Sequence, residues 1–214
     1  MAGKSVKANC LLCGSRYAKV GMTRHLQSCL PKETEEALNQ KKLKIHPLFH
    51  LLVTGSYSPE YWLHLKVKSE STLSNLDQFL RDIWLECCGH MSAFSYKRNE
   101  LPMNRKLKDV LNPGMELLYE YDFGSTTELL IKVISEYMGP IQKNGSIQIV
   151  ARNETPENPC DECGKHPAVQ ICTECQWDDA GWLCQSCADK HECGEDMFLP
   201  VVNSPRTGVC GYAG

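Results

Sequence analysis

Residues 49–67 read FHLLVTGSYSPEYWLHLKV, and this stretch decides the fold because two alternating apolar segments flank a single turn. Apolar side chains occupy every second position over residues 49–53 and again over residues 61–67. Successive side chains of a strand point to opposite faces of a sheet, so this period predicts two strands. A turn through Ser58 and Pro59 would pair them as an antiparallel hairpin.

The residues after the hairpin predict a helix and further strands. Ser71 or Thr72 suits a helix N-cap, and apolar residues follow at helical spacing as far as Trp84. This helix should cover one face of the sheet. More short strands are predicted over residues 91–96, 115–123, 129–134 and 147–150. We therefore expect an α+β domain over residues 46–152, with a mostly antiparallel sheet and a covering helix.

Residues 106–133 read KLKDVLNPGMELLYEYDFGSTTELLIKV and carry a family resemblance. Together with the strand-helix-strand order, this segment resembles the plasmid root-inducing (Ri) ORF-three-like family of uncharacterised prokaryotic proteins. Many of these proteins are associated with plasmids and transposable elements. The likeness covers about residues 46–150, and many members have Asp and then Trp after the glycine, where this chain has Ser125 and Thr127. The resemblance implies an α+β fold and a link to mobile elements, but no established reaction.

The YEYDFG segment raises the question of a catalytic site. Alternation places Tyr119, Tyr121 and Phe123 on one face of the strand, and Glu120 and Asp122 on the other. Aromatic strands that end in a glycine turn are ordinary sheet architecture. We therefore expect a structural role for this segment.

A second catalytic question concerns Cys87, Cys88 and His90, since a Cys-His pair can form a nucleophile. These residues follow an apolar helix, and buried free cysteine is common, so we expect packing in the core or at the helix end. The sequence holds no Gly-rich phosphate loop, nucleophile elbow or metalloprotease helix. The hypothesis of an enzyme therefore has no nominated site, and no small-molecule substrate is identified.

Outward from the sheet domain, the N-terminal segment has the spacing of a small zinc finger. Cys10, Cys13, His25 and Cys29 form the pattern C-x2-C-x11-H-x3-C. A turn would supply the first two thiolates, and a short helix would present His25 and Cys29 one turn apart on one face. We expect this C2HC-like zinc finger to span residues 1–30.

The N-terminal segment is basic, with nine Lys and Arg against three acids in residues 1–44. Basic side chains around the finger are candidates for binding nucleic-acid phosphate, namely Lys7, Arg16, Lys19 and Arg24. A solvated basic face on a structural module is the alternative. Residues 31–45 then read as a charged helical linker, with acids first and lysines last, which suits the helix dipole.

The C-terminal segment, residues 153–214, is acidic and rich in cysteine, with eleven acids against three Lys and Arg. After the linker NETPENP, its candidate ligands are Cys160, Cys163, Cys172, Cys175, Cys184, Cys187, His191 and Cys193. Eight ligands make two tetrahedral sites. In so small a module, metal should contribute most of the stability, and Trp177 and Trp182 should pack over the sites.

The pairing of these ligands has more than one solution. In sequential pairing, four ligands within residues 184–193 would bind one ion. So short a segment leaves little chain to surround the ion. We favour interleaved pairing. In this arrangement the doublet at residues 160 and 163 shares an ion with the doublet at 184 and 187, and the doublet at 172 and 175 shares an ion with the pair at 191 and 193. This order resembles a B-box cross-brace. Cys210 in place of Cys193 is an open alternative, and the tail, residues 197–214, should dock on a neighbouring surface.

Composition limits the class of protein. The chain has 214 residues, 42% of them apolar, and 13 cysteines that lie mostly in C-x-x-C doublets. In a reducing compartment such doublets indicate metal rather than disulfides, so we expect about three structural zinc ions. No run of 18 apolar residues suggests a membrane span, and we expect a cytoplasmic protein without membrane contact.

Three functions follow from these features, in decreasing order of preference. The first is a non-catalytic zinc protein that binds nucleic acid through its basic finger and is linked to mobile genetic elements. The second is an adaptor that holds a protein partner on its C-terminal cross-brace and tail. The third is an enzyme with an unrecognised site in the middle domain.

Overall fold

The stretch at residues 49–67 forms the expected hairpin. In the computed structural model, which describes residues 6–40, 44–142, 145–178 and 180–214, β3 (Ile45–Gly55) pairs antiparallel with β4 (Trp62–Lys68). The register runs from Leu48 opposite Lys68 to Thr54 opposite Trp62. The prediction of a hairpin is confirmed.

The hairpin lies within a seven-stranded sheet whose neighbouring strands are all antiparallel, in the order β6-β5-β7-β8-β3-β4-β9. The expected α+β class with a mostly antiparallel sheet is therefore confirmed. The other strands of this sheet are β5 (Ser92–Tyr96), β6 (Asn99–Leu101), β7 (Glu116–Tyr121), β8 (Thr127–Pro140) and β9 (Ile147–Arg152). A short helix, α3 (Leu107–Val110), lies between β6 and β7.

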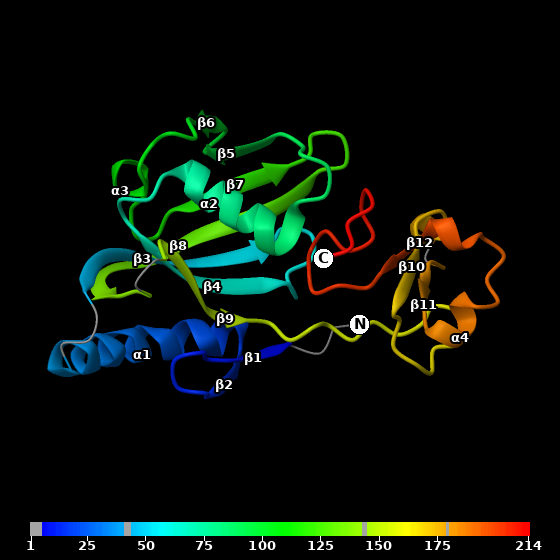
Figure 1. Ribbon diagram of the computed structural model, residues 1–214, viewed down its shortest axis with the longest axis horizontal. Helices are drawn as coiled ribbons and strands as arrows, with labels where there is room; N and C mark the ends of the chain where they lie inside the picture. The colour runs from blue at the N-terminus through cyan, green and yellow to red at the C-terminus, as the bar shows by residue number, and fades with distance from the viewer. Residues whose placement is uncertain (1–5, 41–43, 143–144, 179) are drawn as a thin grey trace.

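One face of the sheet is covered by α2 (Leu73–Leu80) and by the π-helical turn η1 (Arg81–Leu85) that continues it (Figure 1). Thr72 caps α2, because its hydroxyl accepts from the Asn75 backbone N–H while the Asn75 side chain accepts from the Thr72 N–H. The apolar side chains of α2 and η1 are buried in the main core together with the inward-facing side chains of β3 and β4. The covering helix predicted from the sequence is therefore present.

The other face is covered over β8, β3, β4 and β9 by α1 (Lys19–Gln40), which lies below the sheet in Figure 1. Met22, Leu26 and Leu30 pack in a second core with Trp62 and Val150. As a result, β4 is buried on both faces along nearly its whole length.

The finger helix and the linker helix predicted from the sequence form one continuous element. α1 passes through Pro31 and ends at Gln40, and the last part of the predicted linker, residues 41–43, lies outside the described residues. Before α1, β1 (Lys7–Asn9) and β2 (Arg16–Ala18) form a small hairpin. The N–H of Leu11, in the loop of this hairpin, donates to the carbonyl of Val150 on β9 at 2.8 Å.

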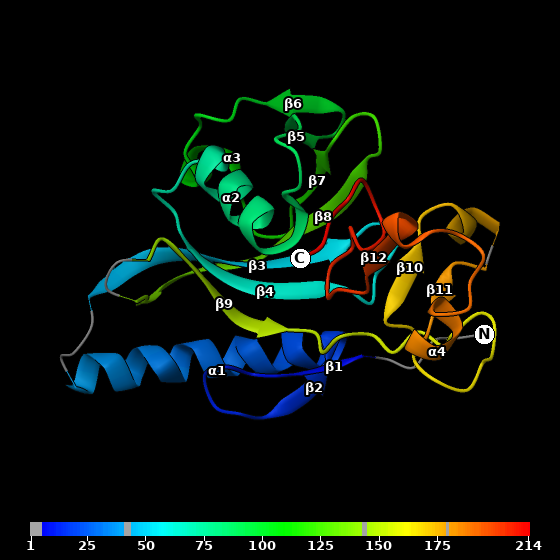
Figure 2. The ribbon, with the colours of Figure 1, turned by 45° about the vertical axis from the view of Figure 1, so that its right-hand side comes forward.

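The C-terminal module contains a three-stranded sheet of order β11-β10-β12. Its elements are β10 (Gln170–Cys172), η2 (Cys175–Asp178), β11 (Trp182–Leu183), α4 (Gln185–Ala188), η3 (Glu195–Met197) and β12 (Phe198–Pro200). The tail after β12 runs back between this module and the main sheet, and both ribbon views show it there (Figures 1 and 2). Within the residues described, no helix combines the length and the apolar content needed to cross a membrane.

The first part of the tail, shortly after β12, is held to the main domain by hydrogen bonds. The indole N–H of Trp84 donates to the carbonyl of Asn203 at 3.0 Å, and the Ser204 hydroxyl donates to the Trp84 carbonyl. The amide side chains of Asn153 and Asn203 pair at 2.8 Å. These contacts place the tail against the end of η1 and the end of β9.

Candidate metal centres

The four ligands predicted in the N-terminal finger come together. The loop between β1 and β2 carries Cys10 and Cys13, and α1 carries His25 and Cys29 one turn apart. Gly14 closes the loop in a left-handed conformation, with φ of +77°, and its N–H donates to the Cys10 carbonyl at 2.8 Å. The four ligand atoms lie within 4.8 Å of one another, so this group can hold a metal ion.

The eight predicted ligands of the C-terminal module gather in two groups, and the pairing is interleaved. One group consists of Cys160, Cys163, Cys184 and Cys187, and the other consists of Cys172, Cys175, His191 and Cys193. Within each group the ligand atoms lie within 4.8 Å of one another. In each group, two ligands early in the module pair with two ligands late in it, and ligands of the other group lie between them in the sequence. The two metal groups therefore connect the module into one unit.

Local structure explains how each doublet faces its partner. Gly164 has φ of +61° and its N–H donates to the Cys160 carbonyl at 2.8 Å, which repeats the closure seen at Gly14. Cys184 precedes α4, so Cys187 follows one turn later on the same side. The other group draws Cys172 from the end of β10 and Cys175 from the start of η2, whereas Cys193 lies between α4 and η3.

The spacing of the ligand atoms fits tetrahedral coordination. Zinc–sulfur bonds of about 2.3 Å imply sulfur–sulfur edges of roughly 3.8 Å and slightly shorter sulfur–nitrogen edges. The sulfurs of Cys163 and Cys184 lie 3.8 Å apart, and the sulfur of Cys175 lies 3.3 Å from Nε2 of His191. In the finger, the sulfur of Cys13 lies 3.2 Å from Nε2 of His25. Disulfide sulfurs lie about 2 Å apart, so these thiols are not paired covalently.

Neighbouring thiols in these groups differ in acidity. Hydrogen bonding to Ser186 lowers the pKa of Cys184 to about 6, and hydrogen bonding to Ser15 lowers the pKa of Cys13 to about 6. Burial raises the pKa of Cys29 to about 12. Close thiolates repel one another, so the last thiol of a group resists ionisation until a cation neutralises the others. Metal binding to these groups should therefore release protons.

The cysteines outside these three groups differ from the sequence-based expectations in two respects. Cys210 does not replace Cys193, because its sulfur lies on the main domain, 3.4 Å from Nε2 of His90. Cys87 packs against the main core just beyond the end of η1, as expected, but it also joins Cys88, His90 and Cys210 in a fourth group whose ligand atoms lie within 4.8 Å of one another. Cys88 and Cys210 are exposed. The sequence signal, Cys-Cys-x-His, was visible, but its fourth partner lies 120 residues away along the chain.

The YEYDFG segment behaves as predicted up to Tyr121 and then departs from strand alternation. Tyr119 and Tyr121 are buried in the main core. Asp122 adopts φ of +65°, so its side chain is buried, whereas Phe123 is 53% exposed. The Asp122 carboxylate accepts from Arg206 at 2.7 Å, and this contact lowers the pKa of Asp122 to about 2.

The four predicted nucleic-acid-binding residues do not form one free basic surface. Arg16 forms an ion pair with Glu154, and Lys19 donates from Nζ to the Pro59 carbonyl at 3.0 Å. Lys7, Arg16 and Lys19 line a hollow of about 940 Å³ that Glu60, Glu154 and Glu157 also line. Arg24 lies apart from this hollow on α1 and is exposed.

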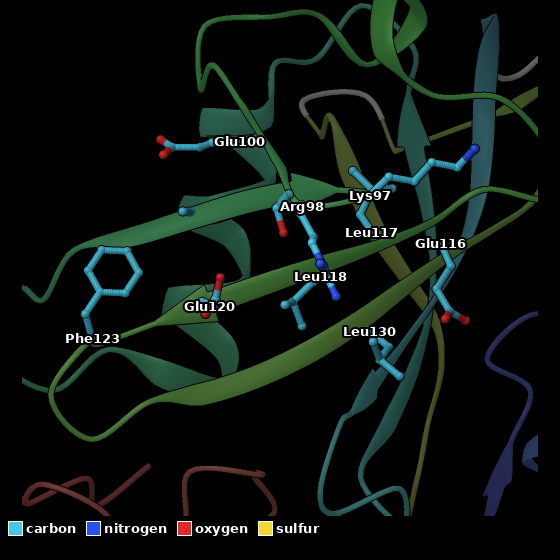
Figure 3. A pocket seen from close by; sticks show the side chains of 11 residues that line it. Lys97, Arg98, Glu100, Glu116, Leu117, Leu118, Glu120, Phe123 and Leu130 are labelled. Carbon is cyan, nitrogen blue, oxygen red and sulfur yellow. The ribbon is translucent and has the colours of Figure 1, made fainter.

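The uncovered half of the sheet is the place where an enzyme hypothesis would seek its site. A hollow of about 540 Å³ lies there over β5, β6, β7 and β8, on the face opposite α2. Figure 3 shows Arg98 and Leu118 in its middle, with Glu100 and Glu116 on opposite sides. The side chains that line it include no Cys or His. Its charged groups do not converge on one point, and the hollow nominates no catalytic pair.

Comparison with known proteins adds little. No known family model matches the chain, and no curated protein matches it. Among solved structures, a protein of unknown function from Methanosarcina mazei Go1 is 17% identical, with a TM-score of 0.41, covering 50% of this chain and 68% of that one. So distant a likeness carries no conclusion. The resemblance to the plasmid root-inducing ORF-three-like family stays a prediction.

Proposed function

We propose that this chain is a non-catalytic zinc-binding adaptor whose acidic C-terminal module binds a basic protein partner. The observation that carries the proposal is a set of exposed acidic side chains on the same module as an exposed tryptophan. Trp177 is 78% exposed on η2, next to the exposed Asp178. The expectation that Trp177 packs over a metal site is wrong, so its indole is free to contact a partner.

The chemistry of the ligands supports zinc. Sets of three or four thiolates with at most one imidazole are typical of structural zinc sites, which have four protein ligands and leave no position for water. This argues for ions that hold the fold rather than carry out a reaction. A zinc ion bound by four thiolates keeps net negative charge, so zinc would make the module more acidic.

The charges of the module support a basic partner. Glu174, Asp178, Glu192 and Glu195 are exposed, and no ion pair between described residues involves them. Unpaired surface charge steers association with a partner of opposite sign. Aromatic side chains such as Trp177 often supply the main apolar anchor of an interface. An acidic surface with one exposed indole therefore suits a Lys- and Arg-rich segment of another protein.

Nucleic-acid binding through the finger is the second candidate. Lys7 and Arg24 are exposed, and neither forms an ion pair within the described part of the chain. Two cations support only weak contact with phosphate, with a shallow dependence on salt, because the slope grows with the number of phosphate contacts. The link to mobile elements and a cytoplasmic location rest on the sequence alone and remain part of this proposal.

The test compares two probes on the zinc-loaded full chain across salt concentrations. One probe is a 15-residue Lys- and Arg-rich peptide, and the other is a 20-base-pair DNA duplex. We expect peptide binding that weakens with salt and falls about tenfold in Trp177→Ala and in Asp178→Lys. Glu36→Lys on α1 is the matched control and should bind like the unaltered chain. Equal peptide binding in all four proteins would contradict the adaptor, and duplex binding lost in Arg24→Ala would favour the second candidate.

A further inference from the structure

We propose that Cys87, Cys88, His90 and Cys210 form a fourth zinc site, one that fastens the C-terminal tail to the main sheet domain. The four ligand atoms lie within 4.8 Å of one another, as in the other three groups. The sulfur of Cys210 lies 3.4 Å from Nε2 of His90, against 3.2 Å and 3.3 Å for the sulfur–nitrogen pairs in the finger and in the second C-terminal group. The geometry is therefore that of a closed tetrahedral site.

The backbone around this group repeats features of the other metal centres. Gly89 follows Cys88 with φ of +74°, as Gly14 and Gly164 follow their cysteines with positive φ. Cys210 itself has φ of +50°, a conformation that non-glycine residues rarely adopt. Such strain persists where other interactions hold the residue, and a metal–thiolate bond from Cys210 would supply one.

A second layer of contacts orients the imidazole. Nδ1 of His90 lies 3.5 Å from the Asp122 carboxylate, so a proton on Nδ1 leaves the Nε2 lone pair facing Cys210. Imidazoles that bind zinc commonly donate their other N–H to a carboxylate in this way. The Asp122 side chain is only 7% exposed, and it is fixed in turn by Arg206. This chain of contacts explains why Asp122 turns inward at the end of YEYDFG.

Arg206 also contacts a cysteine of the group. Its guanidinium donates from Nη2 to the sulfur of Cys87 at 3.5 Å and stacks over the Tyr121 ring, 4.8 Å from its centroid. This guanidinium is fully buried, so the contact fixes the position of the Cys87 sulfur. The tail thus provides both a ligand, Cys210, and a side chain that positions another ligand of the same group.

The group accounts for the cysteine content of the chain. The first C-terminal group contains four of the 13 cysteines, and the finger, the second C-terminal group and this fourth group contain three each. In each of the latter three groups a histidine is the fourth ligand. Three thiolates and one imidazole select zinc over harder cations, which prefer oxygen ligands. Because the ligands lie on segments 120 residues apart, an ion here joins the tail to the end of η1. The main alternative is a disulfide between Cys210 and Cys87 or Cys88.

The test measures zinc per chain on the purified full-length protein by mass spectrometry of the metal, with thiols kept reduced. We expect about four ions in the unaltered chain, and one fewer in Cys210→Ser and in His90→Ala. Ala213→Ser in the tail and His166→Ala, which lies outside all four groups, are the matched controls and should keep all ions. Cys13→Ser should lose a different single ion, which shows that the assay resolves one site.

A second measurement follows the tail. Protease should cut after Arg206 at least tenfold faster in Cys88→Ser than in the unaltered chain, and zinc chelation should abolish that difference. Three ions in the unaltered chain, or an unchanged count in both Cys210→Ser and His90→Ala, would overturn the proposal. A Cys210-linked disulfide peptide in protein purified without reductant, with the metal count unaffected by Cys210→Ser, would show that the group is a redox pair instead.

Discussion

The guanidinium of Arg206 lies 2.7 Å from the carboxylate of Asp122, and the two side chains are 0% and 7% exposed. Arg206 also donates to the Ser125 carbonyl and the Thr127 hydroxyl at 3.0 Å each. Removing one partner of a buried ion pair leaves the other charged and unpaired, which typically costs 3–5 kcal/mol. Arg206→Met should therefore lower the free energy of unfolding by about 3 kcal/mol in urea titrations.

The control for this prediction is Arg105→Met, at an exposed position, which should change stability by less than about 0.5 kcal/mol. Adding Asp122→Asn to Arg206→Met removes the unpaired charge and keeps a residue that tolerates positive φ. The double variant should be more stable than Arg206→Met alone. If the two substitutions are simply additive, the pair does not act as a unit.

A second buried pair joins α1 to the sheet. Lys66 is 1% exposed, and its ammonium donates to both carboxylate oxygens of Glu33 at 2.7 Å and 2.9 Å and to the Pro140 carbonyl at 3.0 Å. Glu33→Ala should lower the free energy of unfolding by about 3 kcal/mol, because the buried ammonium loses its counter-charge. Glu36→Ala, exposed on the same helix, is the control. Equal stability of the two variants in thermal and urea unfolding would contradict this assignment.

The interleaved pairing of the C-terminal module predicts the outcome of two double variants. Cys163→Ala with Cys187→Ala alters one metal group, so the zinc content should fall by one ion per chain. Cys163→Ala with Cys175→Ala alters both groups, so the content should fall by two. Sequential pairing would give the reverse result. Metal analysis of both proteins, with circular dichroism to follow folding, decides between the two.

Two buried histidines predict a loss of stability in mild acid. Burial lowers the pKa of His50 to about 4 and that of His64 to about 3, and the two rings are hydrogen-bonded to each other at 2.9 Å. The unfolded chain takes up protons near pH 6.5, whereas the folded chain resists until about pH 4. Stability from this pair is thus full above about pH 6.5 and is lost as the pH falls toward those folded values.

The measurement for the histidine pair is the slope of unfolding free energy between pH 7.5 and 5.5, with zinc in excess. His50→Leu with His64→Leu should reduce the loss of stability over this pH range by roughly 2–3 kcal/mol in total. His46→Leu, in the same strand, is the control. Any pH dependence that comes from proton release on metal binding is the same in both proteins, so it cancels when they are compared. Identical slopes in the two proteins would show that the pair does not report on acid stability.

The sequence predicted the features that depend on local spacing. The hairpin follows from period-2 alternation, and the predicted metal groups follow from cysteines separated by two intervening residues, since both patterns act within a few residues. The role of α1 was harder to foresee. Trp62, His64 and Lys66 alternate with apolar residues as solvent-facing positions do, yet α1 buries all three. Their partners, such as Glu33, lie far away in the sequence.

Two further differences have the same origin. Cys210 could not be matched with Cys87 from spacing, because only the folded tail brings them together. Asp122 turns inward because its φ is positive, and period-2 alternation cannot anticipate a change of backbone region at one residue. The partners of such residues are set by the whole fold.

The return of the tail to the main domain has a consequence for the order of synthesis. Trp84 is fully buried, but the groups that bind its indole and its carbonyl belong to Asn203 and Ser204. A ribosome therefore completes the entire metal module before it makes the residues that hydrogen-bond to this tryptophan. Until then the indole N–H and the carbonyl of Trp84 lack these partners, and the final contacts of the sheet domain must wait for the module to be translated.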